Sequence, residues 1–256
     1  MQLTKRSHYC LGIALLVCFV PVAFGQQVTL HVNNPPGNNV LNGIYVGPYS
    51  TTNVTTGGSL NVICDDFKDE SNYSPATFTV NTFSSLGNTL WGASLLKAGD
   101  TLAQVTTLYE DAAWLAEGML SQSGAQQGYY SYALWAVFDT TDVAKWLTSQ
   151  GTAGAAACNA VFGSGAWSSG TCTPAKGSGG LLALAEGQQF SPGQFANVTI
   201  LTPNGCTNGP GTCPEQEFLV VPEGGTAAAY LLLAGVACFW AFRTRSKNLT
   251  SVTRVG

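Results

Sequence analysis

The sequence predicts an α+β fold, with a frame of short β-strands forming a β-sandwich or an open β-barrel, an inserted helical segment and one C-terminal transmembrane helix. Short runs of β-branched and aromatic residues, separated by Gly, Asn and Ser, fill the first third of the chain. Apolar residues recur at three- and four-residue spacing in the middle, which is typical of helices. An uncharged run of 17 residues, 226–242, lies near the C-terminus.

The segment 1–25 has the parts of a secretory signal peptide. Lys5 and Arg6 precede an apolar run, and the small residues Ala23 and Gly25 occupy the positions that a signal peptidase reads. We expect cleavage before Gln26, so that the following residues are exported. The segment 26–220 is long enough for a single extracytoplasmic domain with its own core.

Strands are expected at both ends of this domain, with helices between them. The early strands are predicted at 28–32, 43–49, 59–64 and 76–83, and the late ones at 195–202 and 217–221. The periodic apolar positions predict helices at 102–119, 126–138 and 142–148, and two short helices are expected at 153–162 and 180–185.

Cysteine spacing predicts two disulfides in the domain. Cys158 and Cys172 bracket a loop rich in Gly and Ser, and Cys206 and Cys213 bracket the turn TNGPGT. Disulfides form in the oxidising surroundings that an exported chain meets. Cys64 is left without a nearby partner, and we predict a free, largely buried thiol there.

The charge of the domain excludes one class of partner. Between residues 26 and 220 there are thirteen acidic residues, four lysines and no arginine, a net charge of about minus nine. Nucleic-acid binding depends on Lys and Arg displacing counterions, so we expect no nucleic-acid partner.

The sequence also lacks the residues that most catalytic sites need. His31 is the one histidine of the domain, and the sequence contains no nucleophile elbow, phosphate loop, dinucleotide fingerprint or zinc-ligand spacing. We therefore expect a protein that is not an enzyme and that has no cofactor.

Two groups of residues are candidates for binding. Calcium prefers hard oxygen donors, so the densest acidic cluster of the sequence is a candidate site for that ion. The EF-hand spacing is absent, and a solvated acidic turn explains the cluster equally, so we assign no metal. Five tryptophans between residues 26 and 220 raise the alternative of a glycan-binding face, but Trp114 and Trp135 lie at apolar positions of predicted helices, and we assign these two to the core. The acidic cluster consists of Asp65, Asp66, Asp69 and Glu70, to which Asp139 and Asp142 could add ligands.

Three segments together carry a family resemblance. The segments 63–67 (ICDDF), 109–115 (YEDAAWL) and 132–138 (YALWAVF) resemble a group of exported PEP-CTERM proteins and, more distantly, the thioester domains of Gram-positive surface adhesins. In those domains a Cys and a Gln form an internal thioester that captures amines. The resemblance places Cys64 at the Cys position and Ser131 at the Gln position, which implies an inactive thioester-type fold. A covalent adhesin that joins Cys64 to Gln126 or Gln127 is the alternative.

The segment 221–256 resembles the PEP-CTERM sorting signal of Gram-negative bacteria. A Val-Pro-Glu sequence precedes the apolar run, and Gly224 stands where the family has its second Pro. A basic cluster follows the run. A helix of 17 residues is about 25 Å long, which is a minimal membrane span. The resemblance implies processing by an exosortase-type membrane protease, and an ordinary membrane anchor is the alternative. The residues that carry it are Val221, Pro222, Glu223, Arg243, Arg245 and Lys247.

These observations favour an exported, non-enzymatic protein of structural or adhesive role. We expect it to be anchored in the inner membrane during transit and then to reach the cell surface or the extracellular matrix. An extracellular polysaccharide is the expected partner besides the processing protease. A glycan-binding module and the covalent adhesin are the two alternative functions.

Overall fold

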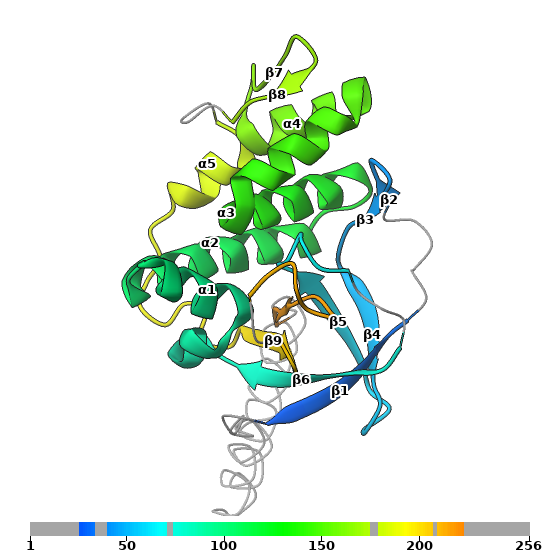
Figure 1. The fold of residues 1–256 in the computed structure, drawn as a ribbon, viewed down its shortest axis with the longest axis vertical. Helices are drawn as coiled ribbons and strands as arrows, with labels where there is room; N and C mark the ends of the chain where they lie inside the picture. The colour runs from blue at the N-terminus through cyan, green and yellow to red at the C-terminus, as the bar shows by residue number, and fades with distance from the viewer. Residues whose placement is uncertain (1–25, 34–39, 71–73, 175–178, 207–208, 223–256) are drawn as a thin grey trace, which may run out of the picture.

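The computed structural model describes residues 26–33, 40–70, 74–174, 179–206 and 209–222. These residues form a β-barrel with a layer of helices stacked on one side of it (Figure 1). The predicted signal peptide and the predicted transmembrane helix lie outside the described residues. Within the described part of the chain, no helix is both long and apolar enough to cross a membrane.

Six strands close the barrel in the order β1-β4-β5-β10-β9-β6, and every neighbouring pair is antiparallel. The α+β class with a barrel frame is therefore confirmed, but neither a sandwich nor an open barrel forms. The barrel closes because β1 pairs with both β4 and β6, which leaves neither side of β1 unpaired. The barrel strands are β1 (Gln27–Val32), β4 (Tyr49–Asn53), β5 (Ser59–Cys64), β6 (Ala76–Asn81), β9 (Thr199–Pro203) and β10 (Phe218–Val220).

Two small hairpins lie outside the barrel. In the first, β2 (Val40–Leu41) pairs with β3 (Ile44–Tyr45), and in the second, β7 (Trp167–Ser168) pairs with β8 (Thr171–Cys172). The strand expected at 43–49 is thus wrong, because its residues divide between β3 and the start of β4.

Over the residues that the structure describes, the helical layer has five α-helices and two short 3-10 helices. The helix predicted from 102 to 119 is α2, whose first turn is capped by the Thr101 side chain and by Gln104 reaching back to the Thr101 backbone. The sequence pattern did not indicate α1. The bounds are η1 (Phe83–Asn88), α1 (Leu90–Ala98), α2 (Leu102–Leu120), α3 (Ala125–Ser149), η2 (Gly151–Gly154), α4 (Ala155–Phe162) and α5 (Leu181–Glu186).

The two helices expected at 126–138 and 142–148 are one kinked helix, α3. Its backbone leaves the helical region at Asp139, with φ −143° and ψ 72°. The Asp139 carboxylate accepts the backbone N–H of Asp142 at 3.0 Å, as an N-cap residue does at the start of a helix. The sequence pattern therefore indicated the break in the right place, although the two halves are continuous in the structure.

One hydrophobic core joins the barrel to the helices. Trp135 is 2% exposed and Trp114 is partly buried against this core, which confirms that both pack there. Both predicted cysteine pairs form disulfides, Cys158 with Cys172 and Cys206 with Cys213. Cys64 is free and buried, as predicted.

Candidate functional site

The end of β5 meets the helical layer at a group of buried polar residues. Cys64 is the last residue of β5 and pairs with Phe218 of β10, so the residue after Cys64 lies beside the residue before Phe218. Asp65 accordingly donates its backbone N–H to the carbonyl of Glu217 at 3.2 Å. The antiparallel register thus places the carboxyl side chains of Asp65 and Glu217 next to each other, although they are 152 positions apart in the sequence.

Glu217 ties three elements to the barrel. Its carboxylate accepts the backbone N–H of Leu90 at 2.6 Å, the hydroxyl of Thr202 at 2.5 Å and the hydroxyl of Tyr109 at 2.7 Å. These donors come from the first turn of α1, from β9 and from α2. Burial raises the pKa of Glu217, whereas its hydrogen-bond donors act to lower it. Glu217 is therefore the acid of this group whose surroundings best hold a negative charge.

Asp65 has the opposite surroundings. Its side chain is fully buried, and among the described residues neither carboxyl oxygen receives a hydrogen bond from a donor group. Burial first, and then the neighbouring charges of Glu217 and Asp66, raise the pKa of Asp65 well above its usual value. A protonated Asp65 can donate to Glu217, so one proton shared between the two acids leaves a single negative charge in the pair.

Asp66 extends this group of acids toward the surface. It is buried, and one carboxyl oxygen accepts the backbone N–H of Lys68 at 2.9 Å. Burial, followed by a hydrogen bond with the Asp69 carboxyl, raises the pKa of Asp66 to about 8. At neutral pH, Asp66 is therefore mostly protonated and uncharged.

The remaining two acids of the predicted calcium cluster have other surroundings. Asp69 accepts the backbone N–H groups of Gly211 at 2.8 Å and Cys213 at 3.0 Å, which fastens the disulfide-closed loop to the barrel end. Glu70 is exposed. Lys68 forms ion pairs with Asp139 at 2.7 Å and Asp142 at 3.4 Å, at the kink of α3. Across the ranges that the structure describes, no three His, Cys, Asp or Glu side chains are grouped to hold a metal ion.

The structure brings together the segments that carry the thioester-domain resemblance. The Trp135 indole of α3 donates to the Cys64 carbonyl at 3.0 Å, and the Cys64 thiol donates to the Asp66 carbonyl at 2.9 Å. Burial, with the charges of Asp66 and Asp65, raises the pKa of the Cys64 thiol well above its usual value. The thiol is therefore a poor nucleophile in the folded protein.

Ser131 lies one turn before Trp135 and is buried. Its hydroxyl accepts the backbone N–H of Gly47 at 3.1 Å and donates to the carbonyl of Gln127 at 3.2 Å. Gln126 and Gln127 are in the first turn of α3, where Gln126 is exposed and Gln127 is half-buried. The Ser131 hydroxyl thus joins α3 to Gly47, just before β4.

An open cleft lies beside this group of residues and has a volume of about 530 Å³. Phe67 forms the centre of its aromatic wall, with ring centroids 5.2 Å from Trp135 and 6.2 Å from Trp146. Tyr45, which is 45% exposed, adds a ring from the β2–β3 hairpin. Volume and lining are typical of a small-ligand site. The lining residues used below are Tyr45, Tyr49, Phe67, Trp135 and Trp146, with Asp69, Glu70 and Gln216 as polar groups.

The sequence indicated only part of this cleft. Asp69 and Glu70 were candidates as part of the acidic cluster, whereas Trp135 was assigned to the core. Tyr45 and Phe67 were not assigned to any binding site. Tyr45 is in a hairpin of two-residue strands, which no periodic pattern could indicate. The hairpin packs closely on α3, since a Cβ atom on Gly128 would lie 2.4 Å from a Leu41 methyl group.

Comparison of this chain with protein-family models, with curated proteins and with solved structures finds no match. Of the predicted sorting signal, Val221 and Pro222 follow β10, while Glu223, Arg243, Arg245 and Lys247 lie outside the described residues.

Proposed function

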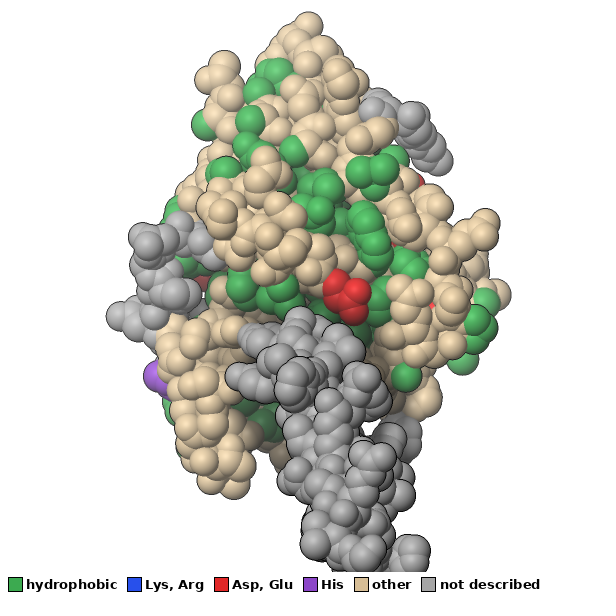
Figure 2. All heavy atoms as spheres, turned by 180° about the vertical axis from the view of Figure 1, so that it is seen from behind, with side chains coloured by type: hydrophobic (Ala, Val, Ile, Leu, Met, Phe, Trp, Pro, Cys, Tyr) green, Lys and Arg blue, Asp and Glu red, His purple; other side chains and the backbone are tan. Residues whose placement is uncertain are grey.

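We propose that this chain is an exported, non-enzymatic protein of the cell surface or the extracellular matrix, sorted through a PEP-CTERM and exosortase-type pathway. The two disulfides are the observation that carries this proposal, because such bonds persist outside the reducing cytoplasm. They agree with the signal peptide and the sorting tail expected from the sequence. The surface agrees as well, since uncharged polar atoms and hydrophobic side chains cover most of the described face in Figure 2.

Terminal peptide mapping tests the sorting proposal. We expect protein recovered from the cell envelope and the medium to begin at Gln26 and to lack residues 226–242. Replacing Val221, Pro222 and Glu223 by alanine should retain the tail, whereas the exposed control Glu70→Gln should be processed normally. Recovery of residues 226–242 in all of the unmodified protein would overturn the exosortase step and leave a plain membrane anchor.

A glycan-binding role is the second candidate, and the aromatic cleft favours it. Aromatic rings offer flat apolar faces on which the C–H groups of a sugar can pack, and Glu70 and Gln216 supply polar groups at the same cleft. A glycan array with the unmodified protein and with Tyr45→Ser tests this role. The Tyr45 carbonyl still accepts the Tyr49 hydroxyl in that variant, so the fold should be kept. The exposed Leu102→Ala is the control outside the cleft.

The covalent alternative, in which Cys64 joins Gln126 or Gln127, has less support. A thioester needs the cysteine sulfur to be bonded to the glutamine side chain. Cys64 is 1% exposed, and its thiol is hydrogen-bonded to the Asp66 backbone instead. Intact mass, described in the Discussion, distinguishes it from the other two functions.

A further inference from the structure

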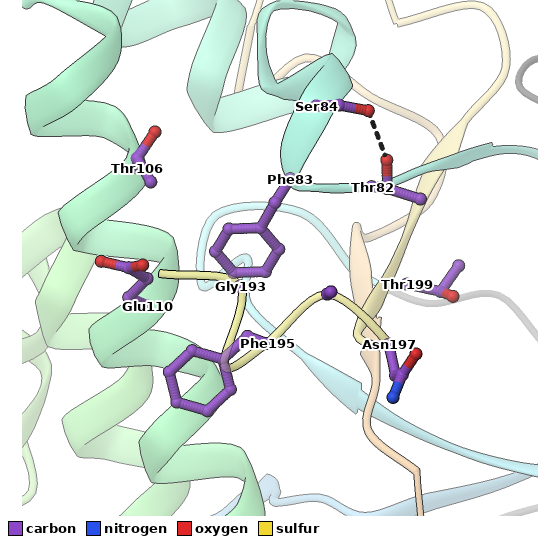
Figure 3. Close-up of a pocket in the computed structure, with 10 residues that line it drawn as sticks. Thr82, Phe83, Ser84, Thr106, Glu110, Gly193, Phe195, Asn197 and Thr199 are labelled. Atoms are coloured by element: carbon purple, nitrogen blue, oxygen red, sulfur yellow. Dashed lines mark hydrogen bonds between the residues drawn. The ribbon is translucent and has the colours of Figure 1, made fainter. Parts of the chain in front are cut away.

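A second cavity, separate from the aromatic cleft, lies between the helical layer and the barrel (Figure 3). It has a volume of about 560 Å³. Three segments line it: the start of η1, the middle of α2 and the loop that leads into β9. None of these segments contributes to the cleft beside Cys64.

Two phenylalanines form the apolar part of this cavity. The rings of Phe83 and Phe195 are stacked, with centroids 6.2 Å apart and planes 24° from parallel. Phe190 packs edge-on against Phe195 at 5.1 Å, and Phe195 is only 3% exposed. In Figure 3 the Phe83 ring projects into the space between α2 and the loop, so this half-buried ring is the one that a ligand can reach.

Hydroxyl and amide groups form most of the polar lining of this cavity. The hydroxyls of Thr82 and Ser84 lie 2.9 Å apart, and the Thr106 hydroxyl donates to the Leu102 carbonyl at 2.8 Å, which leaves its oxygen able to accept. The exposed Asn197 and the half-buried Thr199 continue the polar rim on the other side. An aromatic face ringed by hydroxyl and amide groups is complementary to a sugar ring, which has an apolar face and a hydroxyl edge.

Glu110 adds one negative charge to the lining. Its side chain is half-buried, and it forms no hydrogen bond or ion pair with any residue that the structure describes. Burial raises the pKa of Glu110, because removing a carboxylate from water disfavours its charged form. Of the described lysines, Lys68 and Lys145 pair with acids of α3 and Lys97 borders a different cavity. No basic side chain among the residues that the structure describes lines the cavity at Phe83.

We propose that this cavity binds a sugar unit that carries a free amino group, within a polysaccharide. Phe83 supports the apolar face of the ring, the hydroxyl and amide groups bind its hydroxyls, and Glu110 pairs with its ammonium group. Anionic sugars are disfavoured, because residues 26–220 carry a net charge of about minus nine and Glu110 would lie against a second carboxylate. The inference deepens the glycan-binding candidate by adding a separate site with a named class of ligand.

The test is calorimetric titration of the native protein, purified in mild detergent, with three probes of equal length. The probes are a hexamer of β-1,4-linked glucosamine, its fully N-acetylated counterpart and a hexamer of a uronic acid. We expect the free-amine hexamer to bind most tightly and the uronic acid hexamer not to bind. Added salt should weaken binding of the free-amine hexamer more than binding of the acetylated hexamer, because salt screens the ion pair with Glu110.

Variants assign the binding to this cavity. Glu110→Gln should weaken the free-amine hexamer about fivefold, the effect of one ion pair at a half-exposed position, and should leave the acetylated hexamer unchanged. Glu117→Gln is the matched control, since it removes the same charge from an exposed position on the same helix. Phe83→Leu keeps an apolar side chain in the packing but removes the aromatic face, so it should weaken both hexamers.

The outcomes separate this inference from the proposed function. Equal affinity of the free-amine hexamer for Glu110→Gln and the unmodified protein would overturn it, and so would an equal loss in Glu117→Gln. Binding that is lost only in Tyr45→Ser would place the glycan in the aromatic cleft instead, so the glycan-binding candidate would stand while this second site would fall. Absence of binding by every probe would overturn the second site, whereas the glycan array decides the candidate at the aromatic cleft. Export and tail processing are measured separately and do not depend on any of these results.

Discussion

The buried acids make a specific prediction about pH and stability. The pKa of Asp66 is raised from 3.8 to about 8, so the folded protein keeps a proton that the unfolded chain loses above about pH 4. The stabilisation from this group is therefore complete below pH 4 and is lost as the pH rises toward 8. Asp65 and Glu217, whose pKa values are also raised, act in the same direction.

The magnitude follows from proton linkage. One proton held by the folded state and not by the unfolded state changes the free energy of unfolding by about 1.4 kcal/mol per pH unit. Across the interval from pH 4 to pH 8, Asp66 alone contributes on the order of 5 kcal/mol. That is comparable with the whole stability of a small domain, so the loss should be visible in an ordinary unfolding experiment.

Asp66→Asn isolates this contribution. The asparagine oxygen can still accept the Lys68 N–H, and its amide group replaces the proton of Asp66 toward Asp69. We expect the variant to match the unmodified protein near pH 4, to be more stable at pH 8, and to have a pH slope that is smaller by about 1.4 kcal/mol per unit. Guanidinium unfolding at several pH values, followed by tryptophan fluorescence with the disulfides intact, measures both slopes.

The control for this experiment is Glu70→Gln, which removes an exposed acid from the same segment and should keep the slope of the unmodified protein. Stability that is constant or rises between pH 5 and 8 in the unmodified protein would refute the reasoning. An unchanged slope in Asp66→Asn would show that Asp66 is not the group that holds the proton.

Two further predictions concern the cysteines. Replacing Cys158 and Cys172 by alanine opens a loop with a sequence separation of 14 and should cost about 2 to 4 kcal/mol on the chain-entropy model, seen as a lower unfolding midpoint; an unchanged midpoint would contradict this. Cys64 should react slowly with alkylating agents in the native protein and readily after unfolding, and intact mass should show no loss of ammonia. A mass deficit of one ammonia that methylamine reverses would instead establish the thioester. Ser131→Gln tests whether the fold still holds the two positions within bonding distance, since a gain of that deficit would show that it does.

Local features of the sequence predicted much of the secondary structure. The strand at Ser59–Cys64 has the predicted bounds, and α2 differs from its prediction by one residue at its C-terminal end. The break between two predicted helices is the kink at Asp139, where a side chain caps the second half of α3. Short spacing also identified both disulfides, because a Gly-rich loop can bring its own ends together without the rest of the fold.

The candidate site was predicted only where its residues are close in sequence. Cys64, Asp65 and Asp66 were recognised as one segment and Trp135 was assigned to the core, but the hydrogen bond from Trp135 to the Cys64 carbonyl was not predicted. Glu217 was not recognised, because its importance depends on the pairing of β10 with β5 and on donors from α1, α2 and β9. Tyr45 and the cavity at Phe83 and Glu110 were missed for the same reason.

The sequence by itself thus determined the type of most elements, the cysteine pairs and the anionic character of residues 26–220. Only the tertiary structure decided that the barrel closes, that Asp65 and Glu217 share a buried site, and that Glu110, at the edge of a cavity, has no partner among the described residues. The physical reason is that periodicity, capping and short loops act between neighbours in the chain. Barrel closure, burial and the pKa values that burial shifts depend on strand register and packing between segments far apart in sequence.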